Sequence, residues 1–80
     1  MRRIRQHNFA NIDFVDFQRA AEHYGFELAR ISGSHHIYRH PLLSTELNLQ
    51  PGTSGDAKPY QVRQFLQLVE RYKIPPRIRE

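Results

Sequence analysis

The chain has 80 residues, no cysteine, and a formal net charge of +4 from 12 Lys and Arg against 8 Asp and Glu. A chain this short buries only about 60% of its unfolded surface, so we predict one domain over residues 1–80, with its core at about residues 13–73. The lack of cysteine excludes disulfide frameworks and thiolate zinc sites, and no segment approaches the roughly 18 apolar residues of a membrane span. We therefore expect a cytoplasmic protein that does not bind membranes, and the net charge favours a polyanionic partner.

The first predicted element is a helix over residues 13–24. Its apolar residues recur at spacings of three and four and so form one stripe: Phe14, Phe17, Ala21 and Tyr24. Asp13 is a suitable N-cap, and Gly25 supplies the left-handed residue that ends many helices.

Three strands follow, at residues 26–32, 35–40 and 45–50. Gly33 and Ser34 form a two-residue hairpin turn between the first two strands, and Pro41 stops the second. In the third strand Leu47 and Leu49 alternate with polar residues, which is typical of a sheet that is covered on one face.

A loop over residues 51–56 leads to Lys58 and Pro59, where a second helix begins because proline suits the first helical turn. Its apolar stripe consists of Val62, Phe65, Leu66, Val69 and Tyr72. The order of elements predicts a two-layer α+β fold, α-β-β-β-α, in which both helices cover the same face of a three-stranded antiparallel sheet.

The second strand carries the residues best suited to chemistry. Strand alternation places His35, Ile37 and Arg39 on one face and His36, Tyr38 and His40 on the other. His35 and Arg39 would lie about 13 Å apart, so Arg39 can hold one phosphate of an RNA strand while His35 acts at another. An imidazole can take the proton of a ribose 2′-hydroxyl or protonate the leaving oxygen, and this reaction needs no metal or cofactor.

Two basic residues of the second helix are further candidates for RNA contacts. The N-terminus of a helix attracts anions, and Lys58 there, with Arg63 one turn later, can follow an RNA backbone. A solvated helix start is an equally good interpretation of Lys58. His36 and His40 do not form a zinc site, because a spacing of four brings histidines together on a helix but not on a strand.

Residues 25–28 (GFEL) and 33–41 (GSHHIYRHP) resemble the core motif of HicA-type toxins, and the order and spacing of elements agree over about residues 13–73. The resemblance implies a fold similar to double-stranded-RNA-binding domains and a type II toxin that cleaves mRNA as an endoribonuclease without a cofactor. It also implies a HicB-type antitoxin that covers the active histidine. The family's catalytic histidine directly follows Gly-Ser, which assigns catalysis to His35 but not to His36. We expect RNA contacts from Ser34, Arg39, Lys58 and Arg63.

The chain departs from the family pattern after its third strand. Many members have a Pro-x-His segment with basic residues where this chain has residues 50–56 (QPGTSGD), so the positive charge is lower there. The arginine-rich residues 1–12 can compensate for that charge. Two alternatives to a ribonuclease stay open: a non-catalytic RNA-binding module, and a protein-interaction module that uses its exposed sheet face.

Overall fold

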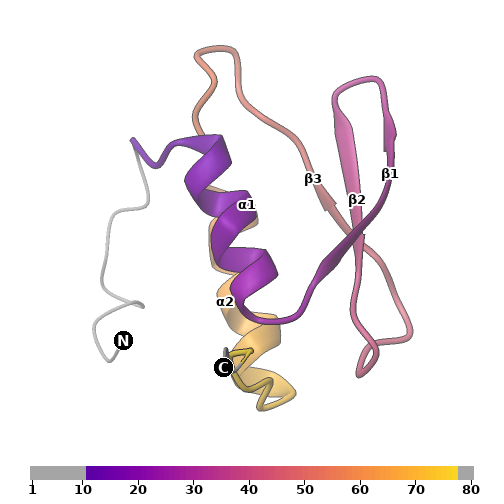
Figure 1. Cartoon of the computed structure of the whole chain (residues 1–80). Coiled ribbons are helices and arrows are strands. Elements are labelled where there is room, and N and C mark those ends of the chain that lie inside the picture. Colours follow the sequence, from indigo (N-terminus) through magenta and orange to yellow (C-terminus); the bar gives the residue numbers. More distant parts are fainter. Residues whose placement is uncertain (1–10, 78–80) are drawn as a thin grey trace.

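The computed structural model describes residues 11–77, so most of the arginine-rich start lies outside the described residues. Its elements are α1 (Phe14–His23), β1 (Glu27–Ser32), β2 (His35–Arg39), β3 (Leu47–Leu49) and α2 (Pro59–Arg71). The strands form an antiparallel sheet in the order β1-β2-β3, and both helices lie on the same side of it (Figure 1). This arrangement confirms the predicted two-layer α+β fold.

The two ends of α1 have the residues that the sequence predicts for them. Asp13 is the N-cap, and its carboxylate accepts a hydrogen bond of 3.1 Å from the backbone N–H of Val15. At the other end Gly25 has a φ of 88°, and its N–H donates to the carbonyl of Glu22 at 2.9 Å. The left-handed glycine turns the chain from α1 into β1.

A two-residue turn joins β1 to β2, as predicted. Gly33 has a φ of 61°, and Ser32 pairs with His35 across the turn. This pairing fixes the register at the tip of the hairpin, so that His35 is the first residue of β2.

A β-bulge at Ala29 interrupts the pairing of β1 with β2. Leu28 pairs with Tyr38, but the next pair joins Arg30 to Ile37, which leaves Ala29 unpaired. Paired residues share a face, so Arg30 lies on the face of Ile37, away from the helices. Strict alternation from Leu28 would have placed Arg30 on the helix side.

The hydrophobic core lies between the sheet and the two helices. Tyr38, Leu47 and Leu49 point into it from the sheet, while Asn48 between the two leucines is exposed. The alternation in β3 is therefore as predicted, but the strand is shorter than residues 45–50. From the helices and loops the core receives Phe14, Phe17, Ala21, Phe26, Ala57, Val62, Phe65 and Ile74.

The second helix begins as predicted but ends differently. Pro59 occupies its first turn after the N-cap Lys58. Tyr72 was predicted to lie in the apolar stripe, which is wrong, because it follows the last helical residue and is 48% exposed. Lys73 takes a left-handed φ of 52°, and the chain turns back so that Ile74 is buried in its place. Neither α1 nor α2, the helices of the described region, has the length and apolar character that crossing a membrane requires.

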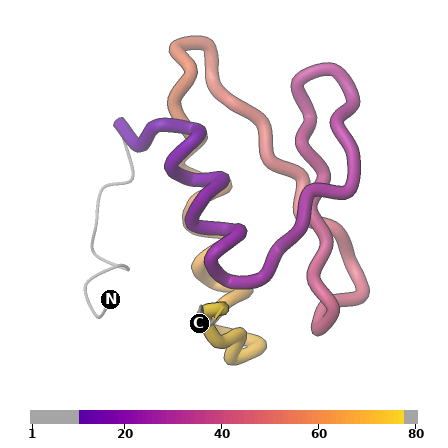
Figure 2. Tube along the Cα trace, viewed as in Figure 1, coloured from indigo at the N-terminus to yellow at the C-terminus, as the bar shows by residue number. Residues whose placement is uncertain are grey.

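The loop after β3 is attached to the start of α1. The N–H of Phe14 donates to the carbonyl of Gly55 at 3.2 Å, and the N–H of Ala57 donates to the carbonyl of Ile12 at 2.7 Å. These bonds bring two segments together that are more than 40 residues apart in the chain (Figure 2). They fix the position of the start of α2 relative to α1.

Candidate active site

His35 lies on the open face of the sheet, which we define as the face away from α1 and α2 that carries His35, Ile37 and Arg39. The side chain is exposed and stands directly after the hairpin turn. Its Nδ1 donates to the amide oxygen of Asn48, in the middle of β3, at 3.2 Å. In the neutral ring this bond leaves the lone pair on Nε2, which is the atom that can accept a proton.

His36 points to the opposite face, as predicted from strand alternation. It is half-buried, its ring stands edge-on to that of Phe14 with centroids 5.1 Å apart, and its Nδ1 donates to the carbonyl of Ser34 at 3.0 Å. The two adjacent histidines therefore cannot act together from one side of a substrate.

His40 is a structural residue. It is 8% exposed and lies against Phe26. Its Nε2 donates to the carbonyl of Tyr24 at 2.9 Å, and its Nδ1 accepts from the backbone N–H of Leu42 at 3.0 Å. Because both ring nitrogens are used, His40 has none left to carry protons or to bind a metal.

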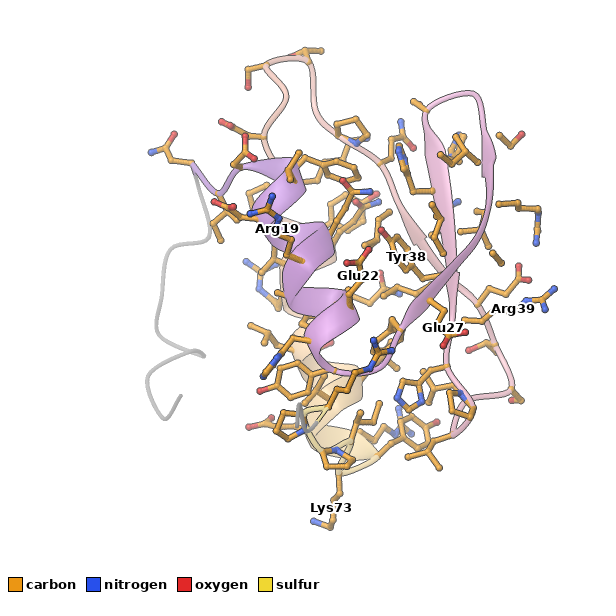
Figure 3. The ribbon with its side chains drawn as sticks, viewed as in Figure 1. Arg19, Glu22, Glu27, Tyr38, Arg39 and Lys73 are labelled. Atoms are coloured by element: carbon orange, nitrogen blue, oxygen red, sulfur yellow. The ribbon has the colours of Figure 1, made fainter. Side chains whose placement is uncertain are left out.

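Arg39 lies on the open face at the other end of β2 from His35, and Figure 3 shows it pointing away from the helices. Its Nε is 3.5 Å from a carboxylate oxygen of Glu46. The same carboxylate accepts two hydrogen bonds of 3.1 Å from Arg30. These bonds lower the pKa of Glu46, with the bond from Arg30 as the largest cause, and Glu46 in turn raises the pKa of Arg30.

Arg30 and Glu46 were missed in the sequence, although both lie beside Arg39. Arg30 reaches the open face only because of the bulge at Ala29, which strict alternation does not predict. Glu46 precedes the short β3 and extends from the segment that joins β2 to β3. The predicted third strand over residues 45–50 included Glu46 on its uncovered face, but nothing in the sequence indicates that Glu46 contacts Arg30 and Arg39.

The predicted RNA contacts fall into two groups. Ser34 is exposed in the hairpin turn next to His35, and this turn joins β1 to β2, the strand that carries Arg39. Lys58 and Arg63 belong to the start and the first turns of α2, in the helical layer, and so do not share the open face. The start of α2 and the hairpin turn nevertheless lie toward the same end of the molecule (Figure 1).

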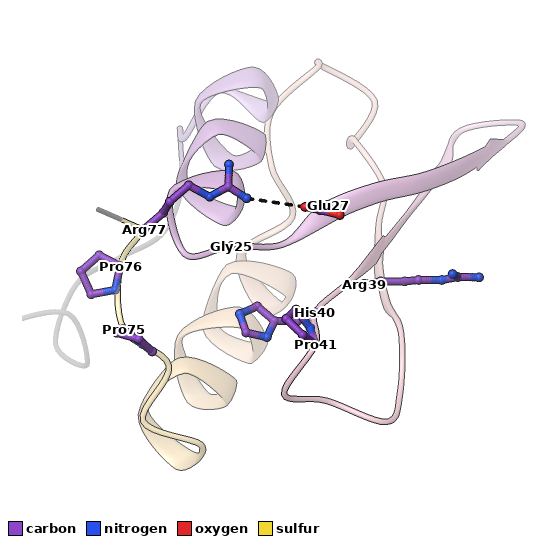
Figure 4. A pocket seen from close by; sticks show the side chains of 8 residues that line it. All are labelled: Gly25, Glu27, Arg39, His40, Pro41, Pro75, Pro76 and Arg77. Atoms are coloured by element: carbon purple, nitrogen blue, oxygen red, sulfur yellow. Dashed lines mark ion pairs between the residues drawn. The ribbon is translucent and has the colours of Figure 1, made fainter. Parts of the chain in front are cut away.

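A pocket of about 580 Å³ lies at the end of the sheet opposite to the hairpin turn, where β1 begins and β2 ends (Figure 4). Arg77 forms one side of this pocket. Its backbone N–H donates to the carbonyl of His23 at 2.6 Å, and its guanidinium is 3.9 Å from the carboxylate of Glu27. His35 is not among the residues that line the pocket. They are Gly25, Glu27, Arg39, His40, Pro41, Pro75, Pro76 and Arg77.

Residues 15–70 match the family model of the HicA toxin of bacterial toxin–antitoxin systems. The match spans more than half of the 80 residues and includes the hairpin turn, the whole of β2 and nearly all of both helices. Comparisons with curated proteins and with solved structures gave no match. On the strength of the family match, the chain belongs to the HicA toxin family of bacterial toxin–antitoxin systems.

Proposed function

We propose that the chain is the toxin of a type II toxin–antitoxin pair and cleaves mRNA in the cytoplasm, with His35 as general acid or base. The observation that carries the proposal is the position of His35: it is exposed beside the hairpin turn, on a face with two arginines, and oriented by Asn48. The family match supports the toxin role.

The reaction that fits this site uses the RNA's own 2′-hydroxyl as the nucleophile. His35 takes the proton of that hydroxyl at Nε2 while the oxygen attacks the adjacent phosphorus. The bond from phosphorus to the 5′-oxygen breaks and this oxygen takes a proton from water, which leaves a 2′,3′-cyclic phosphate on one product and a 5′-hydroxyl on the other. Alternatively, the protonated ring donates its proton to the departing 5′-oxygen, and water takes the proton of the 2′-hydroxyl.

Asn48 is a positioning residue in this proposal. Its amide oxygen accepts the Nδ1 proton of His35, so the ring is held with Nε2 available for the substrate. Arg39 binds a phosphate of the same strand, and Ser34 contacts the backbone beside the turn. No metal or cofactor takes part.

The partner in this proposal is a HicB-type antitoxin that covers the open face and blocks access to His35. Covering a surface that includes Arg39 and Arg30 favours an antitoxin with carboxylates at that position. Growth that stops on expression of the chain should resume when the antitoxin is co-expressed.

The proposal is tested by incubating purified protein with a labelled mRNA transcript. We expect wild-type cleavage to leave cyclic phosphate ends, and His35→Ala to lower the rate by about 100- to 10,000-fold. His36→Ala is the matched control, because the neighbouring imidazole faces the helices, and it should keep most of the activity.

Loss of activity in His36→Ala with retention in His35→Ala would show that the wrong histidine is assigned. Wild-type protein that binds the transcript but leaves it intact would instead identify a non-catalytic RNA-binding module. If the protein neither binds nor cleaves RNA at low salt, the proposed function is wrong.

A further inference from the structure

Two arginines from different strands share one carboxylate on the open face. Arg30 of β1 approaches Glu46 with both terminal nitrogens, each at 3.1 Å from one carboxylate oxygen, and the Nε of Arg39 is 3.5 Å from one of the same oxygens. The contact between Arg30 and Glu46 is bidentate, and arginine also binds phosphate in this geometry. The cluster of Arg30, Arg39 and Glu46 keeps one net positive charge, since two cations share one anion.

The acidic residue beside Arg39 in β1 is paired with a different arginine. Glu27 pairs with Arg39 in the strand register, yet its carboxylate lies 3.9 Å from the guanidinium of Arg77, at the pocket. Glu46 is the carboxylate that contacts both Arg30 and Arg39.

The cluster lies on the same face as the proposed catalytic residue, with its carboxylate at the Arg39 end of β2, about 13 Å along the strand from His35. Arg30 is the β1 partner of Ile37, and Ile37 is two residues from His35 on the same face, about 7 Å along the strand. Ile37 is only 8% exposed although it lies on the open face, which fits an ion-pair bridge that crosses β2 from Arg30 to Glu46.

Displacing Glu46 from the two arginines costs little free energy. The side chains of Arg30, Arg39 and Glu46 are 55%, 68% and 39% exposed, and exposed ion pairs contribute little to stability because water and salt screen them. A phosphodiester offers the same charge and the same two acceptor oxygens to the arginine fork.

We propose that Arg30 and Arg39 form a phosphate-binding site on the same face as His35, and that Glu46 is a carboxylate of the chain itself which the RNA backbone displaces from this site. This inference rests on the proposed function, because it concerns how RNA approaches His35. It assigns Arg30 to RNA binding and gives Glu46 the role of a competitor that weakens binding.

The test measures binding of a 2′-O-methyl RNA oligonucleotide, which lacks the nucleophile and cannot be cleaved, by fluorescence anisotropy over a series of salt concentrations. Glu46→Gln should bind about two- to fivefold more tightly than wild type at low salt, the range that corresponds to an exposed ion pair. Glu22→Gln is the control, because it removes the same charge from α1, in the helical layer, and it should gain less.

Arg30→Gln should bind more weakly than wild type and reduce the slope of log K against log salt by about 0.7, the value for one phosphate of a single strand. The double variant Arg30→Gln/Glu46→Gln should lose the gain of Glu46→Gln. Equal affinities for Glu46→Gln and Glu22→Gln, with RNA still cleaved by wild type, would overturn this inference but leave the proposed function intact. Absence of both RNA binding and cleavage in wild type would overturn both.

Discussion

Three histidines lie within residues 35–40, and each has a different environment. His35 is exposed and bonded to a side chain of the next strand, His36 is half-buried and bonded to its own turn, and His40 is buried with both nitrogens bonded to backbone. Strand alternation predicted which face each one takes. It did not predict that His40 connects the end of α1 to the segment after β2 through its bonds to Tyr24 and Leu42. Tyr24 and Leu42 come close together only in the folded chain.

Tyr38 offers a test of the buried part of the same strand. Its ring is fully buried, and its hydroxyl accepts a hydrogen bond of 3.0 Å from Gln18 of α1. Figure 3 shows Tyr38 pointing toward α1. Burial raises the pKa of Tyr38 and the charge of Glu22 adds to this effect, while the bond from Gln18 acts in the opposite direction.

We predict that Tyr38→Phe unfolds with a free energy about 1 kcal/mol lower than wild type at pH 8, because one hydrogen bond is lost. The folded state holds the phenolic proton to higher pH than the unfolded state. The stabilisation from this group is thus complete below the unfolded pKa of about 10 and declines as the pH rises through the folded pKa. Since phenylalanine does not titrate, the difference between the two proteins should shrink above about pH 10.

Urea denaturation at a series of pH values measures this difference directly. All other ionisable groups are the same in both proteins, so their contributions cancel in the comparison. A difference that stays constant or grows between pH 9 and pH 11 would contradict the assigned direction of the pKa shift.

The helices and the hairpin were predictable because local residues determine them. An N-cap aspartate, a left-handed glycine, a glycine-containing turn and a proline in the first helical turn each act within a few residues. The end of α2 depends instead on tertiary packing: the left-handed Lys73 lets Ile74 enter the core, and Tyr72 is left outside. The periodicity of the helix alone could not distinguish these two residues.

The connection between α1 and β1 leads to a prediction about Gly25. A Cβ at Gly25 would lie 3.1 Å from Nε2 of His40, and the φ of 88° is unfavourable for any residue with a side chain. Gly55 is a matched control, because its φ is 85° but nothing lies within 4 Å of its Cβ position.

We expect Gly55→Ala to cost about 1 to 2 kcal/mol of unfolding free energy from the backbone conformation alone. Gly25→Ala should cost more, since the added methyl group also displaces the His40 ring from its bonds to Tyr24 and Leu42. Denaturation of the two variants under the same conditions gives the comparison, and equal losses would show that the contact with His40 is unimportant.

The candidate site combines residues whose proximity depends on the register of the whole sheet. Sequence reasoning placed His35 and Arg39 on one face, but the bulge at Ala29 moves Arg30 onto that face as well. The same reasoning grouped Lys58 and Arg63 with the other RNA contacts, although α2 lies in the other layer. Binding by both groups requires an RNA strand that passes around the end of the sheet.

Such a path predicts that the length of the RNA determines which basic residues contribute to its binding. A strand that follows β2 from Arg39 past His35 leaves the open face at the hairpin turn, toward the end of the molecule where α2 begins. A short oligonucleotide of about 4 nucleotides should occupy the open face alone, whereas one of about 16 nucleotides can continue to Lys58.

We therefore expect Arg39→Ala to weaken the binding of both lengths of 2′-O-methyl RNA, and Lys58→Ala to weaken only the longer one. For the longer RNA each substitution should lower the slope of log K against log salt by about 0.7, since each removes one phosphate contact. If Lys58→Ala weakens the short oligonucleotide as much as Arg39→Ala does, the short RNA also contacts Lys58 in the helical layer. In that case the proposed path, in which a short RNA occupies the open face alone, is wrong.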